Sequence, residues 1–94
     1  MTYVDRVVKA LDAKIPGNPP ALLRHYAVLV LVRGAATTGR DVHDAWAAWR
    51  LETQPDHRCL VPYGQLPAVV QELDEPYAAA IREVAMTDWG VSRD

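Results

Sequence analysis

The sequence predicts an all-α fold, a single domain of four to five helices, on the strength of three observations. The length of 94 residues suits one small domain. Hydrophobic residues make up 50% of the chain and charged residues 23%, which is the balance of a folded globule rather than a disordered tail. Hydrophobic side chains also recur at steps of three and four between proline and glycine breaks, as in amphipathic helices. We expect this domain to extend over residues 1–94.

The first two helices are delimited by caps and prolines. The first begins after Thr2, because Asp5 follows at a spacing close to that of a capping box, and it ends at Ile15, which precedes a proline. The second follows an Asn18 cap and two prolines, and it continues for about 14 residues to Gly34. Its faces are hydrophobic nearly all round, so it is predicted to be the central helix.

The third helix carries the clearest capping box, formed by Thr38 and Asp41, and is predicted to end before Pro55. Its hydrophobic stripe has helical spacing and consists of Val42, Ala45, Trp46 and Trp49. Pro67 begins a short helical turn further along the chain. Asp74 is then predicted to cap a last helix, whose inner face holds Tyr77, Ala80, Ile81 and Val84. Beyond this helix, Trp89 is expected to tie the chain end back to the core.

Residues 54–66 form an irregular, proline-rich loop that we expect to be ordered. Its large apolar side chains would each forfeit about 1.5–3 kcal/mol if they were left in water. Pro62 and Pro67 fix φ and favour an extended backbone. Large side chains would then recur at every third residue of a polyproline-like ridge, at Leu60, Tyr63 and Leu66. We expect this ridge to lie across the Trp46 face of the third helix and to close the core.

A set of motifs between residues 42 and 85 resembles a known family. The set consists of His43-x-x-Trp46-Ala47, His57, Leu60-Val61-Pro62-Tyr63, Leu66-Pro67 and Asp74. It resembles the repeat domain of ryanodine receptors (RyR), which also occurs as single copies in bacterial and phage proteins. The chain as a whole is similar to a group of small actinobacterial and actinophage proteins. The resemblance implies a helical binding or regulatory module with no known reaction. It also implies a homodimer, since the receptor repeats occur in tandem pairs.

The charge and the cysteine content argue against several classes of protein. Ten Lys and Arg residues against twelve Asp and Glu residues give a net charge of −2, whereas nucleic-acid binders usually carry a basic excess. The single cysteine cannot form an internal disulfide and suits a reducing compartment. The sequence has no signal-peptide pattern and no apolar run of about 18 residues. We therefore expect a cytoplasmic protein that does not enter a membrane.

Two arrangements of residues could indicate catalysis or metal binding, and the sequence favours neither. Cys59 lies two residues from His57, but no glycine-rich oxyanion element precedes it, and a catalytic thiolate needs a base held by a third group. A zinc site would draw on these two residues with His43 and with His25 or Asp56. The paired Cys-x-x-Cys or His-x-x-x-His spacing of such sites is absent. We therefore predict that the protein is not an enzyme and has no metal or cofactor.

The favoured function is binding, of an unknown protein partner first and of a small anionic or nucleotide-like ligand second. The expected binding surface consists of His43, Trp46, Arg50, Arg58 and Tyr63. His43 is expected either to donate a hydrogen bond to a carbonyl of the 54–66 loop or to face a pocket beside Trp46. The two tryptophans of the third helix, if exposed, would stack a base or hold an anion between Arg50 and Arg58. A helix-turn-helix over residues 38–49 is the DNA-binding alternative, with weak attraction to phosphate because its acidic residues offset its arginines.

Overall fold

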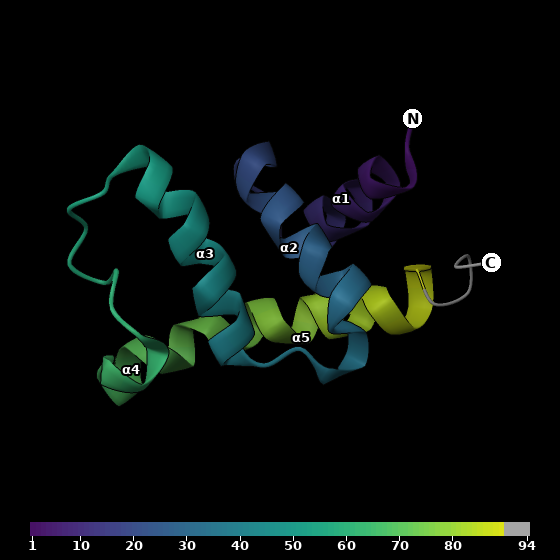
Figure 1. Cartoon of the computed structure of the whole chain (residues 1–94). Coiled ribbons are helices and arrows are strands. Elements are labelled where there is room, and N and C mark those ends of the chain that lie inside the picture. The colour runs from purple at the N-terminus through teal and green to yellow at the C-terminus, as the bar shows by residue number, and fades with distance from the viewer. Residues whose placement is uncertain (90–94) are drawn as a thin grey trace.

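The structure is a computed structural model that describes residues 1–89 of the chain (Figure 1). Its elements within that range are helical: α1 (Tyr3–Lys14), α2 (Pro20–Val32), η1 (Gly34–Ala36), α3 (Gly39–Thr53), η2 (Tyr63–Gln65), α4 (Ala68–Gln71), η3 (Glu72–Asp74), α5 (Glu75–Val84) and η4 (Ala85–Trp89). The predicted all-α fold class is confirmed. The core contact predicted for the Trp89 side chain and the domain end predicted at residue 94 fall outside what the structure describes.

Helix α2 lies at the centre of the fold, as its hydrophobic character on nearly every face predicts. It packs against α1, α3 and α5, and α5 also contacts α1 and α3 (Figure 1). These four helices share one core, whose fully buried side chains include Leu11, Leu23, Val30, Val42, Ile81 and Val84. Helices α2, α3 and α5 therefore meet one another, and the candidate site lies where they meet.

Both predicted capping boxes are present. The Asp5 backbone N–H donates to Thr2 Oγ1 at 3.1 Å, and the Asp41 backbone N–H donates to Thr38 Oγ1 at 3.2 Å. In each box the aspartate carboxylate accepts in return from the backbone N–H of the cap residue at 2.9 Å. Arg33 also donates from Nε to Asp41 at 2.9 Å, which ties the end of α2 to the start of α3. The starts of α1 and α3 were thus predicted correctly from local sequence.

Two other predicted caps are wrong. Asn18 does not cap α2, because Pro19 holds the N-cap position and the Asn18 amide donates instead to the Ile15 carbonyl at 2.8 Å. Asp74 precedes α5, but its side chain makes no capping hydrogen bond and its backbone is already helical, with φ −84° and ψ −16°. The reason is that η3 continues directly into α5, so Asp74 lies within a helical turn and not at a free helix start. Its carboxylate is thereby left for other contacts.

The loop over residues 54–66 is attached to the helices, as predicted, but it does not form a continuous extended ridge. Pro62 and Pro67 have extended backbones, with ψ of 143° and 148°. Between them η2 turns the chain, which interrupts the extended backbone. The Gln71 side-chain amide fixes this turn by donating to the carbonyls of Tyr63 and Leu66, at 2.9 and 3.1 Å.

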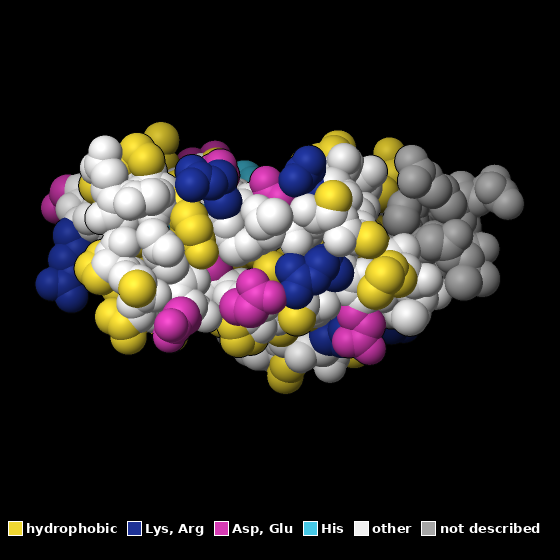
Figure 2. Space-filling view, turned by 90° about the horizontal axis from the view of Figure 1, so that it is seen from below, with side chains coloured by type: hydrophobic (Ala, Val, Ile, Leu, Met, Phe, Trp, Pro, Cys, Tyr) yellow, Lys and Arg dark blue, Asp and Glu magenta, His cyan; other side chains and the backbone are white. Residues whose placement is uncertain are grey.

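Basic and acidic side chains are interspersed on the described part of the face seen from below α5 (Figure 2). On α5 (Glu75–Val84), Arg82 and Glu75 form an ion pair, with Nη2 and Oε1 at 2.7 Å. This face therefore offers no continuous positive surface to a phosphate backbone. Within residues 1–89, no helix has both the length and the apolar character that crossing a membrane requires.

Candidate functional site

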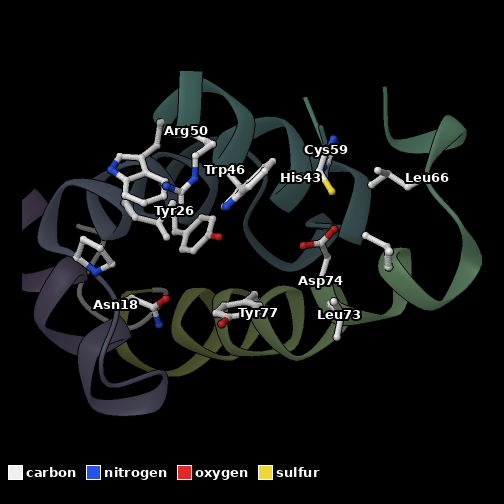
Figure 3. A pocket seen from close by; sticks show the side chains of 14 residues that line it. Asn18, Tyr26, His43, Trp46, Arg50, Cys59, Leu66, Leu73, Asp74 and Tyr77 are labelled. Carbon is white, nitrogen blue, oxygen red and sulfur yellow. The ribbon is translucent and has the colours of Figure 1, made fainter. Parts of the chain in front are cut away.

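A pocket of about 410 Å³ opens where α2, α3 and the η3–α5 segment meet (Figure 3). We call it the Trp46 pocket; the residues of its lining that supply aromatic rings or charged groups are Tyr26, His43, Trp46, Trp49, Arg50, Asp74 and Tyr77. Pockets that bind small molecules measure roughly 300–1,000 Å³ and combine apolar walls with a few convergent polar groups. The Trp46 pocket has both features.

Trp46 is fixed in place by two histidines. Its ring stacks on the His43 ring at a centroid distance of 5.6 Å and meets the His57 ring edge-on at 5.1 Å. The buried His43 also donates from Nε2 to the Val61 carbonyl at 2.7 Å, since a carbonyl oxygen can only accept. The prediction that His43 binds a loop carbonyl is therefore confirmed, and the same residue also lines the pocket beside Trp46. The loop and α3 together orient the indole.

Arg50 supplies a cation at one side of the pocket. Its guanidinium carbon lies 4.4 Å from the centroid of the Trp49 ring and 5.9 Å from that of Trp46. The Nε atom is buried and has no hydrogen-bond partner among the described residues. A buried donor without an acceptor costs about 1–3 kcal/mol. Arg50 is therefore held by cation–π contacts while its hydrogen-bonding capacity is not fully used.

Tyr26 and Asp74 supply further polar groups to the pocket. Tyr26 is 2% exposed, and its hydroxyl makes no hydrogen bond within the described part of the chain. Its hydroxyl and the Asp74 carboxylate point toward each other across the pocket (Figure 3). Burial raises the pKa of Tyr26, with Tyr77 and Asp74 adding to the effect, so the phenol keeps its proton at neutral pH.

Burial also raises the pKa of the half-buried Asp74 carboxyl, an effect that the neighbouring His43 partly opposes. No described residue donates a hydrogen bond to this carboxylate or forms an ion pair with it. The folded state therefore binds the Asp74 proton more tightly than the unfolded state does. The carboxylate consequently reduces stability as pH rises from its usual pKa of 3.8 through its raised value.

Asp74→Asn is expected to raise the melting temperature of the ligand-free protein at about pH 7, because the uncharged amide avoids the cost of burying the carboxylate. At about pH 3 the same substitution is expected to have little effect, because the carboxyl is protonated in both states. Thermal unfolding followed by circular dichroism at the two pH values measures this difference. Asp12→Asn, at an exposed position of α1, is the matched control and should leave the melting temperature unchanged at both pH values. A lower melting temperature for Asp74→Asn at about pH 7 would mean that the carboxylate stabilises the fold.

The structure brings together three of the five predicted binding residues, namely His43, Trp46 and Arg50. Tyr63 lies behind His43, with ring centroids 6.1 Å apart, and does not line the pocket. Arg58 is exposed and also lies outside the pocket lining. Sequence reasoning missed Tyr26, Asp74 and Tyr77. The signals that the sequence offers for them are a single tyrosine in a mostly aliphatic helix and an aspartate at the start of the last helix.

The neighbouring cysteine and histidine of the loop do not form a base-activated thiol. The backbone N–H of Cys59 donates to His57 Nδ1 at 3.0 Å, which occupies the nitrogen that would otherwise accept a thiol proton. In the part of the chain that the structure describes, no three His, Cys, Asp or Glu side chains group closely enough to hold a metal ion.

The fold and the pocket define a class, a small all-α domain with an aromatic-lined cavity between three of its helices. A family model described as "Domain of unknown function (DUF7701)" matches residues 2–86, and the chain belongs to this family. The match covers α1 to α5, so the family's domain is the whole helical unit described above. No curated protein and no solved structure matches the chain. The resemblance to ryanodine-receptor repeats stays a prediction.

Proposed function

We propose that the protein is a binding domain without catalytic activity, and that its Trp46 pocket takes a small planar ligand that carries an anionic group. The observation that carries this proposal is the position of Arg50, whose side chain lines the pocket beside two tryptophan rings and forms no ion pair with a described carboxylate. Guanidinium groups bind carboxylate and phosphate through paired hydrogen bonds, so an anion is the natural complement.

The aromatic walls favour a planar ligand over an aliphatic one. Trp46 is a partly buried ring held by His43 and His57, so it loses little side-chain freedom when a ligand stacks on it. Stacking of a ring on such a side chain contributes about 1–3 kcal/mol. Aromatic acids and nucleotide-like ligands combine a planar ring with an anionic group, which is the chemistry that the pocket would select.

Calorimetry with two matched compounds tests the proposal. The first is para-ethylhydrocinnamate, an aromatic carboxylate, and the second is its uncharged amide, which has nearly the same shape. We expect the acid to bind one site and the amide to bind at least about tenfold more weakly, because a hydrogen bond to a charged group contributes about 1.5–3 kcal/mol. Equal affinities, or no binding of the acid, would contradict the proposal.

A protein partner is the second candidate function, and a separate surface favours it. An apolar groove of about 460 Å³ runs along the outer side of α3, between Leu51 and the loop residues Leu60 to Pro62. Leu51 is 57% exposed, which is high for a leucine and would be covered by a bound chain. Sedimentation of the wild-type protein tests the homodimer form of this proposal, since a strict monomer at high concentration would remove it.

A further inference from the structure

The side of the Trp46 pocket opposite Arg50 favours a different chemical group of the ligand from the side that Arg50 lines. Among the described residues that line the pocket, Asp74 is the single carboxylate. In Figure 3, Arg50 and Asp74 lie on different sides of the Trp46 ring, and the two do not form an ion pair. The pocket therefore presents a cation at one side and an anion at the other.

The basic groups near Asp74 are engaged elsewhere. Arg82 bridges Glu75 at 2.7 Å and the Thr37 carbonyl at 2.9 Å. Arg40 lies over the Tyr63 ring, with its guanidinium carbon 5.4 Å from the ring centroid. The carboxylate is thus half-buried and forms no ion pair with a described Lys or Arg, although carboxylates at such depth are usually paired.

The groups that face Asp74 come from three helices and suit a cationic ligand group. His43 faces it from α3, Tyr26 from α2, and Tyr77 from the first turn of α5. The rings of Tyr26 and Tyr77 lie 5.9 Å apart, and the protonated Tyr26 hydroxyl offers an oxygen that can accept a hydrogen bond. A carboxylate beside tyrosine rings attracts ammonium groups through charge and through the ring faces. His43 donates a hydrogen bond from Nε2 to the Val61 carbonyl, so this N–H group is not available to Asp74.

We propose that the ligand of the Trp46 pocket is a zwitterion, whose protonated amino group binds Asp74 and the Tyr26 hydroxyl while its anionic group binds Arg50 at the opposite side. This inference rests on the proposed function, because it assigns the second end of the same ligand. It also specifies the arrangement of charges. The amino and acidic groups stand at opposite ends of a planar frame.

Two isosteric probes test the inference by calorimetry. One is para-ethylhydrocinnamate, and the other is para-(aminomethyl)hydrocinnamate, in which an ammonium group replaces the terminal methyl group. The wild-type protein is expected to bind the aminomethyl compound about tenfold more tightly, as a charge-assisted hydrogen bond predicts. The Asp74→Asn variant is expected to lose this preference, because its uncharged amide does not attract the ammonium group. Thermal unfolding of the variant verifies that it is folded.

The outcomes separate the inference from the function on which it rests. If the ethyl compound binds but the preference for the aminomethyl compound is the same in wild-type and Asp74→Asn protein, the amino-group site is wrong and the anion site stands. If neither compound binds the wild-type protein, the proposed function itself is wrong. Tyr26→Phe provides a second variant that keeps the ring. It should reduce the preference in part, because it removes the hydroxyl and leaves the carboxylate.

Discussion

Replacing His43 with alanine is expected to lower the free energy of unfolding by about 2–4 kcal/mol and to release the 54–66 loop from α3. The substitution removes the 2.7 Å hydrogen bond to the Val61 carbonyl and leaves that carbonyl without a partner, a loss of about 1–3 kcal/mol. It also removes the ring stacked on Trp46 and leaves a cavity at a position that is 3% exposed. Urea denaturation gives the stability, and amide hydrogen exchange at residues 57–63 gives the release of the loop.

His25 provides the matched control for this prediction. It is a half-buried histidine on α2 that makes no hydrogen bond with the described residues. His25→Ala is expected to cost less than about 1 kcal/mol and to leave hydrogen exchange in the loop unchanged. If the two variants lose equal stability, or if exchange in the loop stays slow in His43→Ala, then His43 does not hold the loop on α3.

Arg50→Met is expected to reduce the affinity for para-ethylhydrocinnamate by about 30-fold or more, because the anion would lose its charged donor. The methionine keeps much of the side-chain length and its contact with the tryptophan rings, but it has no positive charge. The stability of the variant should fall by no more than about 1 kcal/mol. The loss of the cation–π contacts is offset by removal of a buried Nε–H that has no partner.

Arg58→Met is the control, since this exposed loop arginine lies outside the pocket lining. The sequence predicts that Arg58 shares the anion site with Arg50. The two variants therefore show whether the anion binds at the loop surface that includes Arg58 or in the Trp46 pocket. Calorimetry should give an unchanged affinity for Arg58→Met and a strongly reduced one for Arg50→Met. The opposite result would place the anion site on the loop surface.

The helices were predictable because their limits are set by local interactions. Thr2 and Thr38 begin α1 and α3 through capping boxes, and Pro20 begins the central helix α2. These signals lie within a few residues of the boundary that they define. The direction of the chain through η2 was not predictable in this way. It depends on Gln71, which fixes the turn from a separate helix.

Only the part of the site that lies on a single helix was predictable from the sequence. Helical spacing placed His43, Trp46 and Arg50 along α3, and the structure confirms that all three line one pocket. Asp74 and Tyr26 reach the same pocket from other segments. Periodicity indicates which side chains face inward, but the space left between docked helices depends on tertiary packing. The capping pattern also concealed Asp74, because η3 continues into α5 without a free helix start.

The account depends on a pocket that is already formed by the packing of α2, α3 and α5 and that binds an aromatic anion at Arg50. Titration of para-ethylhydrocinnamate into nitrogen-15-labelled protein tests this most directly, because the spectrum resolves the Arg50 Nε–H and the Trp46 indole N–H. We predict that both resonances shift along one saturable curve while the backbone amides of α1 stay in place. Absence of a saturable shift at these two groups, with the largest changes elsewhere in the chain, would contradict the account.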